Sequence, residues 1–364
     1  MKIVTISVDQ INLPLAKPFV TSRRKAASLS SAVVKITTDT GHVGYGEAPS
    51  NHSVTGDTKE AAEAAVLNYI SQNLIGREIS DLESNMEILN SSMQCNVSAK
   101  AATDIALYDL WGQLYNAPLY KLLGGYKSTL KTDMTISVGT KMVEDAIKQK
   151  DLGFDTLKIK VGTGGLKDFD TIMDISKAVG DNISLRIDAN QGWTAKEAVR
   201  IIKKLEHSGA NIEFVEQPVN ARDFSGMAFV TKNTMTDIAA DESVFSPKDV
   251  VDILKMEAAD IINIKLIKSG GIHNAIKICN IAESFGKPCM VGSMLESDLG
   301  AVAAAHFAAS QKNVKYVDLD TPFFVSGRAT QGGIIYNGKN ISFSKGAGLG
   351  IEKLAANIEK PYEF

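Results

Sequence analysis

Seven charged side chains in the second half of the chain each lie within or at the end of a short apolar run. They are Lys158, Lys160, Asp188, Glu216, Asp241, Lys265 and Asp318. From the second lysine to the third, consecutive members are separated by about 24 to 28 residues, the length of one strand, one helix and two short loops. Because the carboxyl ends of the strands in a parallel barrel meet at one mouth, the spacing predicts that these side chains share one site.

Three of these residues, Asp188, Glu216 and Asp241, offer oxygen ligands from three successive units of the pattern. Carboxylate oxygens favour Mg²⁺, or Mn²⁺ as a substitute, over zinc or copper, and the histidines of the chain lie away from the predicted strand ends. A single carboxylate at a strand end is more simply a helix cap or a surface ion pair. Three together would be costly to bury unless a cation compensated them, so the pattern predicts a magnesium site.

The lysines provide candidate bases on two sides of that site. Lys158 and Lys160 alternate with Ile159 on a predicted strand, so both amines point to the barrel interior. Two ammonium groups at close range repel each other, which is expected to lower the pKa of at least one and make it a usable general base. Lys265 lies across the predicted barrel. A simpler role, neutralising an acidic mouth, stays open for these lysines.

Two bases on opposite sides of a metal-bound carboxylate are suited to inverting a stereocentre. The metal would stabilise the enediolate that forms when the α-carbon of a carboxylate substrate loses its proton. One lysine would remove that proton and the opposite lysine would return a proton to the other face, so the product would be an epimer. If only one lysine transfers protons, the same site would be suited to a β-elimination.

Asp318 and Asp320 repeat this alternation at the last predicted strand, so both carboxylates are expected to face the mouth. Paired negative charge in a partly dry site is suited to binding a substrate ammonium group. The alternative is a structural role, either a salt bridge from Asp318 to Lys158 or a contact with the C-terminal tail.

The elements that position these residues alternate between strand and helix from about residue 132 onward, which is typical of an α/β fold with a parallel sheet. Candidate strands are residues 132–138, 156–161, 183–188, 212–216, 237–241, 261–265, 288–292 and 314–318. Seven helices are expected between them. Thr194 and Glu197 form a capping box at one helix start, and Ser246 caps another helix before a proline at its first position.

The first part of the chain has a different pattern, with predicted strands followed by helices, and is expected to form a separate α+β domain. Its strands are expected at residues 2–12, 31–40 and 42–47, and its helices at about 57–74, 80–92 and 97–116. We therefore divide the chain into an α+β domain (residues 1–125), a barrel (residues 126–322) and a tail (residues 323–364) that packs on the first domain.

The composition is that of an ordinary globular enzyme, with 44% hydrophobic and 22% charged residues. A formal net charge of −3 gives no reason to expect nucleic acid or an anionic membrane as a partner. No apolar run approaches the roughly 20 residues of a membrane span, and the N-terminal segment lacks the apolar core of a signal peptide. Three widely spaced cysteines, without a Cys-x-x-Cys motif, are expected to be free thiols in a reducing cytoplasm.

These residues together resemble the enolase superfamily and, within it, the muconate-lactonizing-enzyme subgroup. The residues that carry the resemblance are Lys158 and Lys160, the carboxylates Asp188, Glu216 and Asp241, and Lys265 in Asn-Ile-Lys-Leu. The resemblance covers essentially the whole chain and implies a (β/α)7β modified TIM barrel with an N-terminal α+β capping domain completed by the C-terminal tail. Relatives of mandelate racemase would carry a His–Asp pair in place of Lys265, and enolase itself lacks the Lys-x-Lys motif.

Within the subgroup, Asp318-Leu319-Asp320 is similar to the pair that binds the substrate α-ammonium in dipeptide epimerases, and the run from Gly292 to Ser297 resembles that group's loop after the seventh strand. The substrate contacts that the resemblance implies are Thr135, Lys158, Lys160, Asn190, Ser293, Met294, Leu295, Asp318 and Asp320. It also implies that Arg24 faces an acidic side chain of the substrate, with Arg23 and Lys25 as alternatives in the same basic cluster.

Such an enzyme is expected to convert L-Ala-D-Glu into L-Ala-L-Glu in the salvage of murein peptides in the cytoplasm. The alternatives within the superfamily are an N-acylamino acid racemase and an o-succinylbenzoate synthase or other cycloisomerase. A non-catalytic barrel that only binds a ligand is disfavoured by the completeness of the residue set. The expected partners are Mg²⁺, a small-molecule dipeptide and further copies of the chain, because barrel enzymes of this type often form homo-oligomers.

Overall fold

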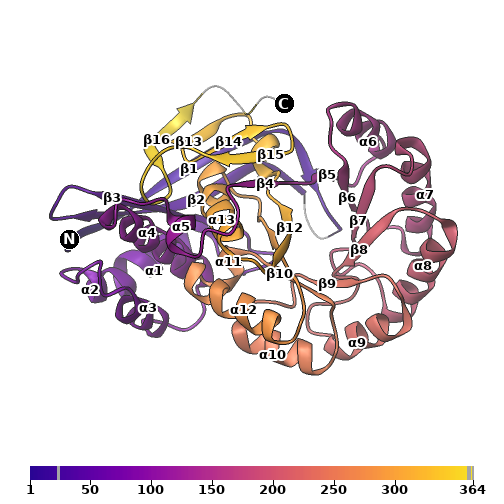
Figure 1. Cartoon of the computed structure of the whole chain (residues 1–364), viewed down its shortest axis with the longest axis horizontal. Helices are drawn as coiled ribbons and strands as arrows, with labels where there is room; N and C mark the ends of the chain where they lie inside the picture. Colours follow the sequence, from indigo (N-terminus) through magenta and orange to yellow (C-terminus); the bar gives the residue numbers. More distant parts are fainter. Residues whose placement is uncertain (23–24, 359–361, 363–364) are drawn as a thin grey trace.

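A barrel forms the larger part of the computed structural model, which describes residues 1–22, 25–358 and 362. In this described part of the chain, eight parallel strands form one sheet and follow one another in sequence order (Figure 1). They are β5 (Met134–Ile136), β6 (Thr156–Lys160), β7 (Ser184–Asp188), β8 (Ile212–Glu216), β9 (Ile238–Ala240), β10 (Ile261–Ile264), β11 (Cys289–Gly292) and β12 (Val314–Asp318). The predicted barrel strands are confirmed.

Hydrogen bonds join the two ends of this sheet, β5 and β12. The Leu319 N–H donates to Thr132 Oγ1 at 2.8 Å, and the Thr135 N–H donates to Asp320 Oδ2 at 2.6 Å. The barrel is therefore nearly closed, and the closing contact involves two residues that were singled out as substrate contacts.

Helices in the connections between the strands cover the outside of the barrel (Figure 1). They are α6 (Met142–Asp151), α7 (Asp168–Val179), α8 (Ala195–Ser208), α9 (Phe224–Asn233), α10 (Pro247–Lys255), α11 (Leu266–Ser269), α12 (Ile272–Ser284) and α13 (Asp298–Ser310), with single turns η2 (Gly165–Lys167) and η3 (Thr321–Phe323). The capping box of Thr194 and Glu197 and the Ser246 cap are both present. The expected (β/α)7β fold is confirmed, and no helix in the described residues is long and apolar enough to cross a membrane.

The N-terminal domain packs an antiparallel sheet against a helical layer. Its strands are β1 (Ile3–Val20), β2 (Lys25–Thr38) and β3 (Val43–Pro49), and its helices are α1 (Lys59–Ala65), the π-helical turn η1 (Val66–Ile70), α2 (Ser71–Leu74), α3 (Leu82–Ser91), α4 (Val97–Leu114) and α5 (Leu119–Leu122). Helix α4 is buried along nearly its whole length. A Cβ at Gly46 would lie 1.9 Å from the Ala102 carbonyl oxygen, so this close packing requires glycine on β3.

Strand β1 extends beyond the residue range predicted from its alternation. Its distal end pairs with the start of β2, where Phe19 lies opposite Ala26, and it also pairs with the tail, where Leu15 bridges Val325. These partners come from distant parts of the chain, so the local pattern of β1 could not indicate them. The extension carries residues 16–22, which we call the strap, over the mouth of the barrel.

The tail contacts both the barrel and the N-terminal domain. Its strands are β13 (Arg328–Gly332), which pairs with β16 (Ile351–Ile358), and β14 (Ile334–Asn337) and β15 (Asn340–Phe343), which form a sheet with β4 (Thr129–Lys131). Two hydrogen bonds reach the N-terminal domain, from the Leu349 N–H to Asp109 Oδ1 at 2.8 Å and from the Leu119 N–H to the Gly348 carbonyl at 2.7 Å.

Candidate active site

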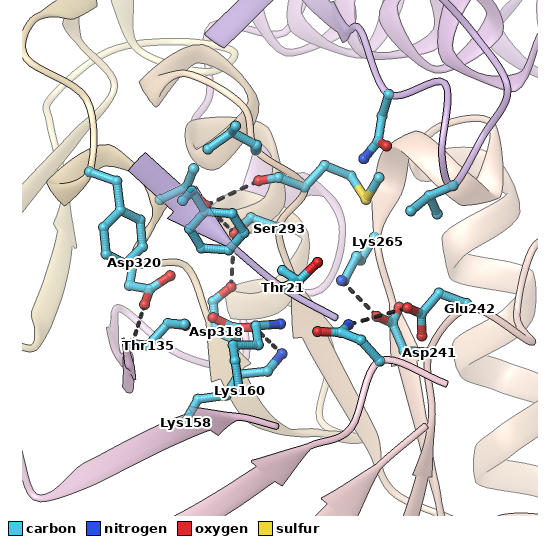
Figure 2. A pocket seen from close by; sticks show the side chains of 18 of the residues that line it. Thr21, Thr135, Lys158, Lys160, Asp241, Glu242, Lys265, Ser293, Asp318 and Asp320 are labelled. Atoms are coloured by element: carbon cyan, nitrogen blue, oxygen red, sulfur yellow. Dashed lines mark hydrogen bonds and ion pairs between the residues drawn. The ribbon is translucent and has the colours of Figure 1, made fainter. Parts of the chain in front are cut away.

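The strand registers place the predicted catalytic and metal-binding residues at one level of the barrel. Lys160 on β6 lies opposite Asp188 on β7, and Asp188 lies opposite Glu216 on β8. Asp241 directly follows β9, and Lys265 directly follows β10. These side chains converge on the mouth at the carboxyl ends of the strands, as Figure 2 shows for Lys160, Asp241 and Lys265.

Lys158 lies at the centre of a carboxylate cluster. Its Nζ is 2.7 Å from Glu216 Oε2, 2.8 Å from Asp318 Oδ2 and 3.1 Å from Asp188 Oδ2, and the residue is 1% exposed. Burial alone would lower the pKa of Lys158, but these carboxylates raise it well above its usual value. Repulsion between the two lysines therefore does not lower the pKa of Lys158, because the neighbouring acids outweigh it.

Lys160 and Lys265 face each other across the site. In the sheet order β7, β8 and β9 separate β6 from β10, so the two lysines come from opposite sides of the barrel (Figure 2). Lys160 Nζ is 2.5 Å from Asp188 Oδ2, and Lys265 Nζ is 2.8 Å from Asp241 Oδ2. Burial favours the neutral form of Lys265, but Asp241 raises its pKa above the usual value. Each amine is thus held by a different carboxylate of the predicted metal-binding set.

Lys268 is a member of the cluster that the sequence analysis missed. It is 0% exposed in α11, and its Nζ lies 2.6 Å from Asp241 Oδ1 and also donates to the Asp241 carbonyl oxygen. Burial would raise the pKa of the Asp241 carboxyl, but Lys265 and Lys268 hold it well below its usual range. The alternation of β10 gives no signal for Lys268, because this residue lies in the helix beyond the strand.

Asn263 is a second missed member, and it supports Glu216. Asn263 Nδ2 donates a hydrogen bond to Glu216 Oε1 at 2.9 Å. Burial, followed by the nearby Asp188 carboxylate, raises the pKa of Glu216 to about 7. Asn263 precedes Lys265 by two residues in the predicted strand 261–265, so the same alternation that placed Lys265 inside the barrel also indicates Asn263.

Several buried oxygen atoms around the cluster have no hydrogen-bond partner among the described residues. They are Asn190 Oδ1, Glu242 Oε2 and Asn263 Oδ1. Unpaired oxygens are uncommon in protein interiors, and a catalytic role or a bound ion or water is among the reasons for them. Asp188, Glu216 and Asp241, each at most 1% exposed, add further hard oxygen donors. The residues present therefore fit Mg²⁺ or Mn²⁺.

A second acidic group lies on the other side of Lys158. Asp133, Asp318 and Asp320 are buried and bring carboxylate oxygens within 4.8 Å of one another, which is close enough to hold a metal ion. Asp133 Oδ2 already has a cationic partner, Arg186 NH1, at 2.8 Å. The barrel therefore contains two acidic groups, and among the described residues it is this second group that brings three carboxylate oxygens so close together. Asp133 is a member of it that the sequence analysis did not identify.

Asp318 and Asp320 have different partners within that group. The salt bridge from Asp318 to Lys158, considered as a structural alternative, is present at 2.8 Å. Asp320 Oδ2 instead accepts a hydrogen bond from the Thr135 N–H, and burial followed by the Asp318 charge raises the pKa of Asp320 to about 7. Both carboxylates also line the cavity at the mouth (Figure 2), so the salt bridge does not remove Asp318 from the site.

The loops after β7 and β8 adopt an uncommon backbone conformation. Asn190, Gln191 and Gln217 have φ values of 43°, 67° and 37°, in the left-handed region that few residues other than glycine occupy. Gln217 Oε1 accepts hydrogen bonds from the backbone N–H of Asp241 at 2.9 Å and of Ser243 at 3.2 Å. The unusual turn thus positions the predicted ligand Asp241, consistent with the clustering of backbone strain at functional sites.

A cavity of about 70 Å³ opens above these groups (Figure 2). The predicted substrate contacts that line it are Thr135, Lys158, Lys160, Asn190, Ser293, Met294, Leu295, Asp318 and Asp320. Arg24 and its alternative Arg23 lie outside the described residues. Residues that sequence reasoning did not identify also line the cavity, among them Phe19 from β1, Val54 from the loop after β3, and Phe324 from the tail.

The strap is tied to elements on both sides of the mouth. The Ala16 N–H donates to the Phe324 carbonyl at 2.9 Å, and the Val138 N–H donates to the Val20 carbonyl at 3.2 Å. Ser22 Oγ donates to the Asn190 carbonyl oxygen at 3.0 Å. The N-terminal domain therefore supplies part of the cavity wall, whereas the charged residues that line the cavity in the described part of the chain come from the barrel.

Two family models match the chain. The model described as mandelate racemase/muconate lactonizing enzyme, N-terminal domain, matches residues 3–124. The model described as enolase C-terminal domain-like matches residues 141–355, the region that contains the lysines and carboxylates of the site.

Known proteins with these features are similar to the chain along nearly its whole length. The L-Ala-D/L-Glu epimerase of Clostridium acetobutylicum is 48% identical over 97% of this chain and 99% of the relative. A substrate-liganded structure of the L-Ala-D/L-Glu epimerase from Bacillus subtilis has a TM-score of 0.96 at 46% identity, covering 98% and 100% of the two chains. The dipeptide epimerase of Enterococcus faecalis, complexed with Mg and L-Leu-L-Tyr, has a TM-score of 0.93 at 41% identity, covering 96% and 99%. The chain therefore belongs to the mandelate racemase/muconate lactonizing enzyme family of the enolase superfamily, and it is an isomerase.

Proposed function

We propose that this isomerase is a Mg²⁺-dependent dipeptide epimerase that inverts the α-carbon of the C-terminal residue and interconverts L-Ala-D-Glu and L-Ala-L-Glu. The observation that carries the proposal is the opposition of Lys160 and Lys265 across one mouth, on strands separated by three others, with buried carboxylates between them. Relatives that are 46–48% identical are named for this epimerisation. A murein dipeptide of this composition would place the enzyme in peptide salvage in the cytoplasm.

Asp188, Glu216 and Asp241 are the residues that we expect to hold the metal ion. Their donors are all carboxylate oxygens, and unpaired oxygens of Asn190 and Asn263 lie around them. When bound, Mg²⁺ would supply positive charge that stabilises negative charge developing on the substrate carboxylate. The E. faecalis structure, which contains Mg, supports this assignment of metal type. The same oxygen donors suit Mn²⁺ as a substitute.

The chain's own lysines account for the proton transfers. For one epimer Lys160 removes the α-proton and Lys265 delivers a proton to the opposite face, and for the other epimer the roles are exchanged. Lys158 contacts three carboxylates at once and is fully buried, so we assign it to charge stabilisation near the substrate carboxylate and not to proton transfer. Inversion follows because the two amines approach from opposite sides.

The second acidic group is suited to the other end of the dipeptide. We propose that Asp318 and Asp320 receive the α-ammonium, since both line the cavity and lie at its β12 side. Thr135, Asn190 and the segment Ser293–Leu295 would contact the backbone of the dipeptide. Arg24 stays the proposed partner of the acidic side chain.

Deuterium exchange tests the proposal directly. L-Ala-D-Glu or L-Ala-L-Glu is incubated with enzyme and Mg²⁺ in D₂O, and the two epimers are resolved by chromatography and mass spectrometry. We expect deuterium at the α-carbon of glutamate in both epimers, starting from either one. If neither epimer incorporates deuterium with this pair or with a small library of other dipeptides, dipeptide epimerisation is ruled out.

One observation favours a second candidate, an N-acylamino acid racemase. The 2.8 Å salt bridge to Lys158 gives Asp318 a role that does not require a substrate ammonium group. A racemase of N-acylated amino acids would use the same lysines and metal site, but it would prefer N-succinyl or N-acetyl amino acids to dipeptides with a free ammonium. Comparing the turnover of N-succinylglutamate with that of L-Ala-L-Glu separates the two functions.

A further inference from the structure

A wall of two aromatic rings separates the site from a second cavity. The ring centroids of Phe19 and Phe324 are 5.6 Å apart, and the ring planes are tilted by 52°. Both residues line the inner cavity of about 70 Å³ and an outer cavity of about 450 Å³, and Thr135 is the third residue that the two cavities share. Phe19, Thr135 and Phe324 therefore form the partition between the cavities.

The backbone holds both rings in place. The Phe324 carbonyl accepts a hydrogen bond from the Ala16 N–H at 2.9 Å, and the Phe324 N–H donates to the Thr321 carbonyl at 3.0 Å. Phe19 is paired with Ala26 in the β1–β2 ladder. The partition thus joins the strap to the tail, and a ring can leave it only by rotation of its side chain.

The wall stands next to the proposed ammonium receptor. Thr135 donates its N–H to Asp320 Oδ2 at 2.6 Å, and the Asp320 carbonyl accepts from the N–H of Phe323, directly before Phe324. In a dipeptide, the side chain of the N-terminal residue is attached to the same carbon that carries the ammonium group. An ammonium bound at Asp320 therefore places that side chain beside the wall.

We infer that Phe19 and Phe324 set the upper size of the N-terminal side chain of the dipeptide. The inference rests on the proposed function and adds a specificity determinant to it. The inner cavity accommodates a methyl group at this position, whereas a leucine side chain must displace a ring. Removing either ring joins the inner cavity to the outer one, whose volume of about 450 Å³ accepts a larger aliphatic side chain.

The test compares L-Leu-L-Glu with L-Ala-L-Glu in the wild-type enzyme and in the Phe324→Ala and Phe19→Ala variants, with α-deuterium exchange as the measure of kcat/KM. We expect the ratio of kcat/KM for the leucine dipeptide to that for the alanine dipeptide to rise at least about tenfold in each variant, the range that one or two methylene groups provide in an apolar pocket. Phe229→Ala is the matched control, because Phe229 is 45% exposed on α9 and lines neither cavity. Its ratio should stay at the wild-type value.

The inference is overturned if the wild-type enzyme already prefers the leucine dipeptide, if neither variant changes the ratio, or if Phe229→Ala raises it equally. Should the alanine variants fail to fold, Phe324→Leu keeps an apolar side chain there and should give a smaller rise in the same direction; an unchanged ratio in that variant also overturns the inference. A wild-type enzyme that turns over neither dipeptide contradicts the proposed function itself, so the two failures are distinguishable.

Discussion

The two halves of the mouth are built from different parts of the chain and by different interactions. The half formed by β6 to β10 carries charged residues, from Lys160 to Lys265, and ion pairs or hydrogen bonds connect them to neighbouring buried groups. The facing half carries Phe19, Val54 and Phe324, which come from the N-terminal domain and the tail. Backbone hydrogen bonds and a ring contact hold the wall of this second half.

The difference separates the chemistry from the choice of substrate. Removing one partner of a buried ion pair costs about 3–5 kcal/mol, because the other charge is left uncompensated, so the charged half tolerates little change. Volume-conserving apolar exchanges usually cost less than about 1.5 kcal/mol, so the apolar half can accept other side chains of similar size while the charged half stays intact. Substitutions in the first half should stop the reaction for every substrate, whereas those in the second half should redistribute activity among substrates.

The largest effect is expected from removing a single base. Lys160→Ala and Lys265→Ala should each lower the rate of epimerisation about 10²–10⁴-fold, the usual contribution of general acid–base catalysis. Each variant keeps one amine, so each should still exchange the α-proton of one epimer with D₂O, and the two variants should act on opposite epimers. The measurement is deuterium incorporation into separately supplied L-Ala-D-Glu and L-Ala-L-Glu.

Lys131→Ala is the matched control for these variants. Lys131 forms an ion pair with Asp155 at 2.5 Å, but its side chain is half exposed and lies on β4, outside the mouth. Its removal should leave epimerisation at the wild-type rate. Wild-type epimerisation in either site variant, or exchange of the same epimer by both, would refute the two-base scheme.

The next effect concerns which acidic centre binds the metal. Glu216→Gln should raise the Mg²⁺ concentration needed for half-maximal activity by more than about 100-fold, since it removes a direct ligand, which matters more than an outer partner. Asp133→Asn should leave that concentration almost unchanged, because Asp133 is paired with Arg186. Calorimetric titration with Mn²⁺ measures binding independently of activity. The assignment is reversed if Asp133→Asn abolishes binding and Glu216→Gln preserves it.

The positions of the strand-end residues could be predicted because they follow from the regular repeat of strands and helices in the sequence. The strand alternation and the nearly even spacing place Lys160, Asp188 and Glu216 at the same level, and the observed registers agree. A parallel barrel repeats one geometric unit, so local patterns are enough to identify which side chains share its mouth.

The remainder of the site depends on contacts that no local pattern contains. Lys268 reaches Asp241 from a short helix, and Phe19 meets Phe324 only because β1 pairs with the tail. The pKa of Lys158 is raised instead of lowered because a third carboxylate, Asp318, reaches it from the last strand. Each of these features is set by tertiary packing between distant segments.

A smaller effect should separate the two members of the ammonium receptor. Asp320→Asn should raise KM for L-Ala-L-Glu about 10- to 100-fold with little change in kcat, the loss expected for a charge-assisted hydrogen bond of about 1.5–3 kcal/mol. Asp318→Asn should lower kcat as well, because Asp318 also holds Lys158. Steady-state kinetics with N-acetyl-L-Ala-L-Glu provides the control, since that compound lacks the ammonium group. Equal losses for both compounds would argue against a receptor at Asp320.

The smallest effect on activity is expected from a substitution at the contact between the N-terminal domain and the barrel. Asp104 on α4 accepts hydrogen bonds from the N–H groups of Ile272 at 2.6 Å and His273 at 3.2 Å, at the start of α12. A Cβ at Gly271 would lie 2.2 Å from Asp104 Cγ, so the carboxyl group packs directly against the backbone. The residue is 1% exposed, and burial raises the pKa of Asp104 to about 8.

The raised pKa of Asp104 predicts how the free energy of unfolding changes with pH. An unfolded Asp104 loses its proton near pH 4, whereas the folded protein keeps this proton up to about pH 8. Between pH 4 and pH 8 the folded state therefore binds more protons than the unfolded state. The free energy of unfolding falls as the pH rises through this range. Asp104→Asn cannot titrate, so it should remove up to about 1.4 kcal/mol per pH unit from this decline between pH 5 and pH 7. Urea unfolding at several pH values measures the slope, and turnover at pH 7 should stay near wild type because the charged half of the mouth is untouched. If the free energy of unfolding has the same pH slope in the wild type and in Asp104→Asn, Asp104 is ionised in the folded state. If Asp104→Asn loses turnover, the contact between the domains also positions Lys265.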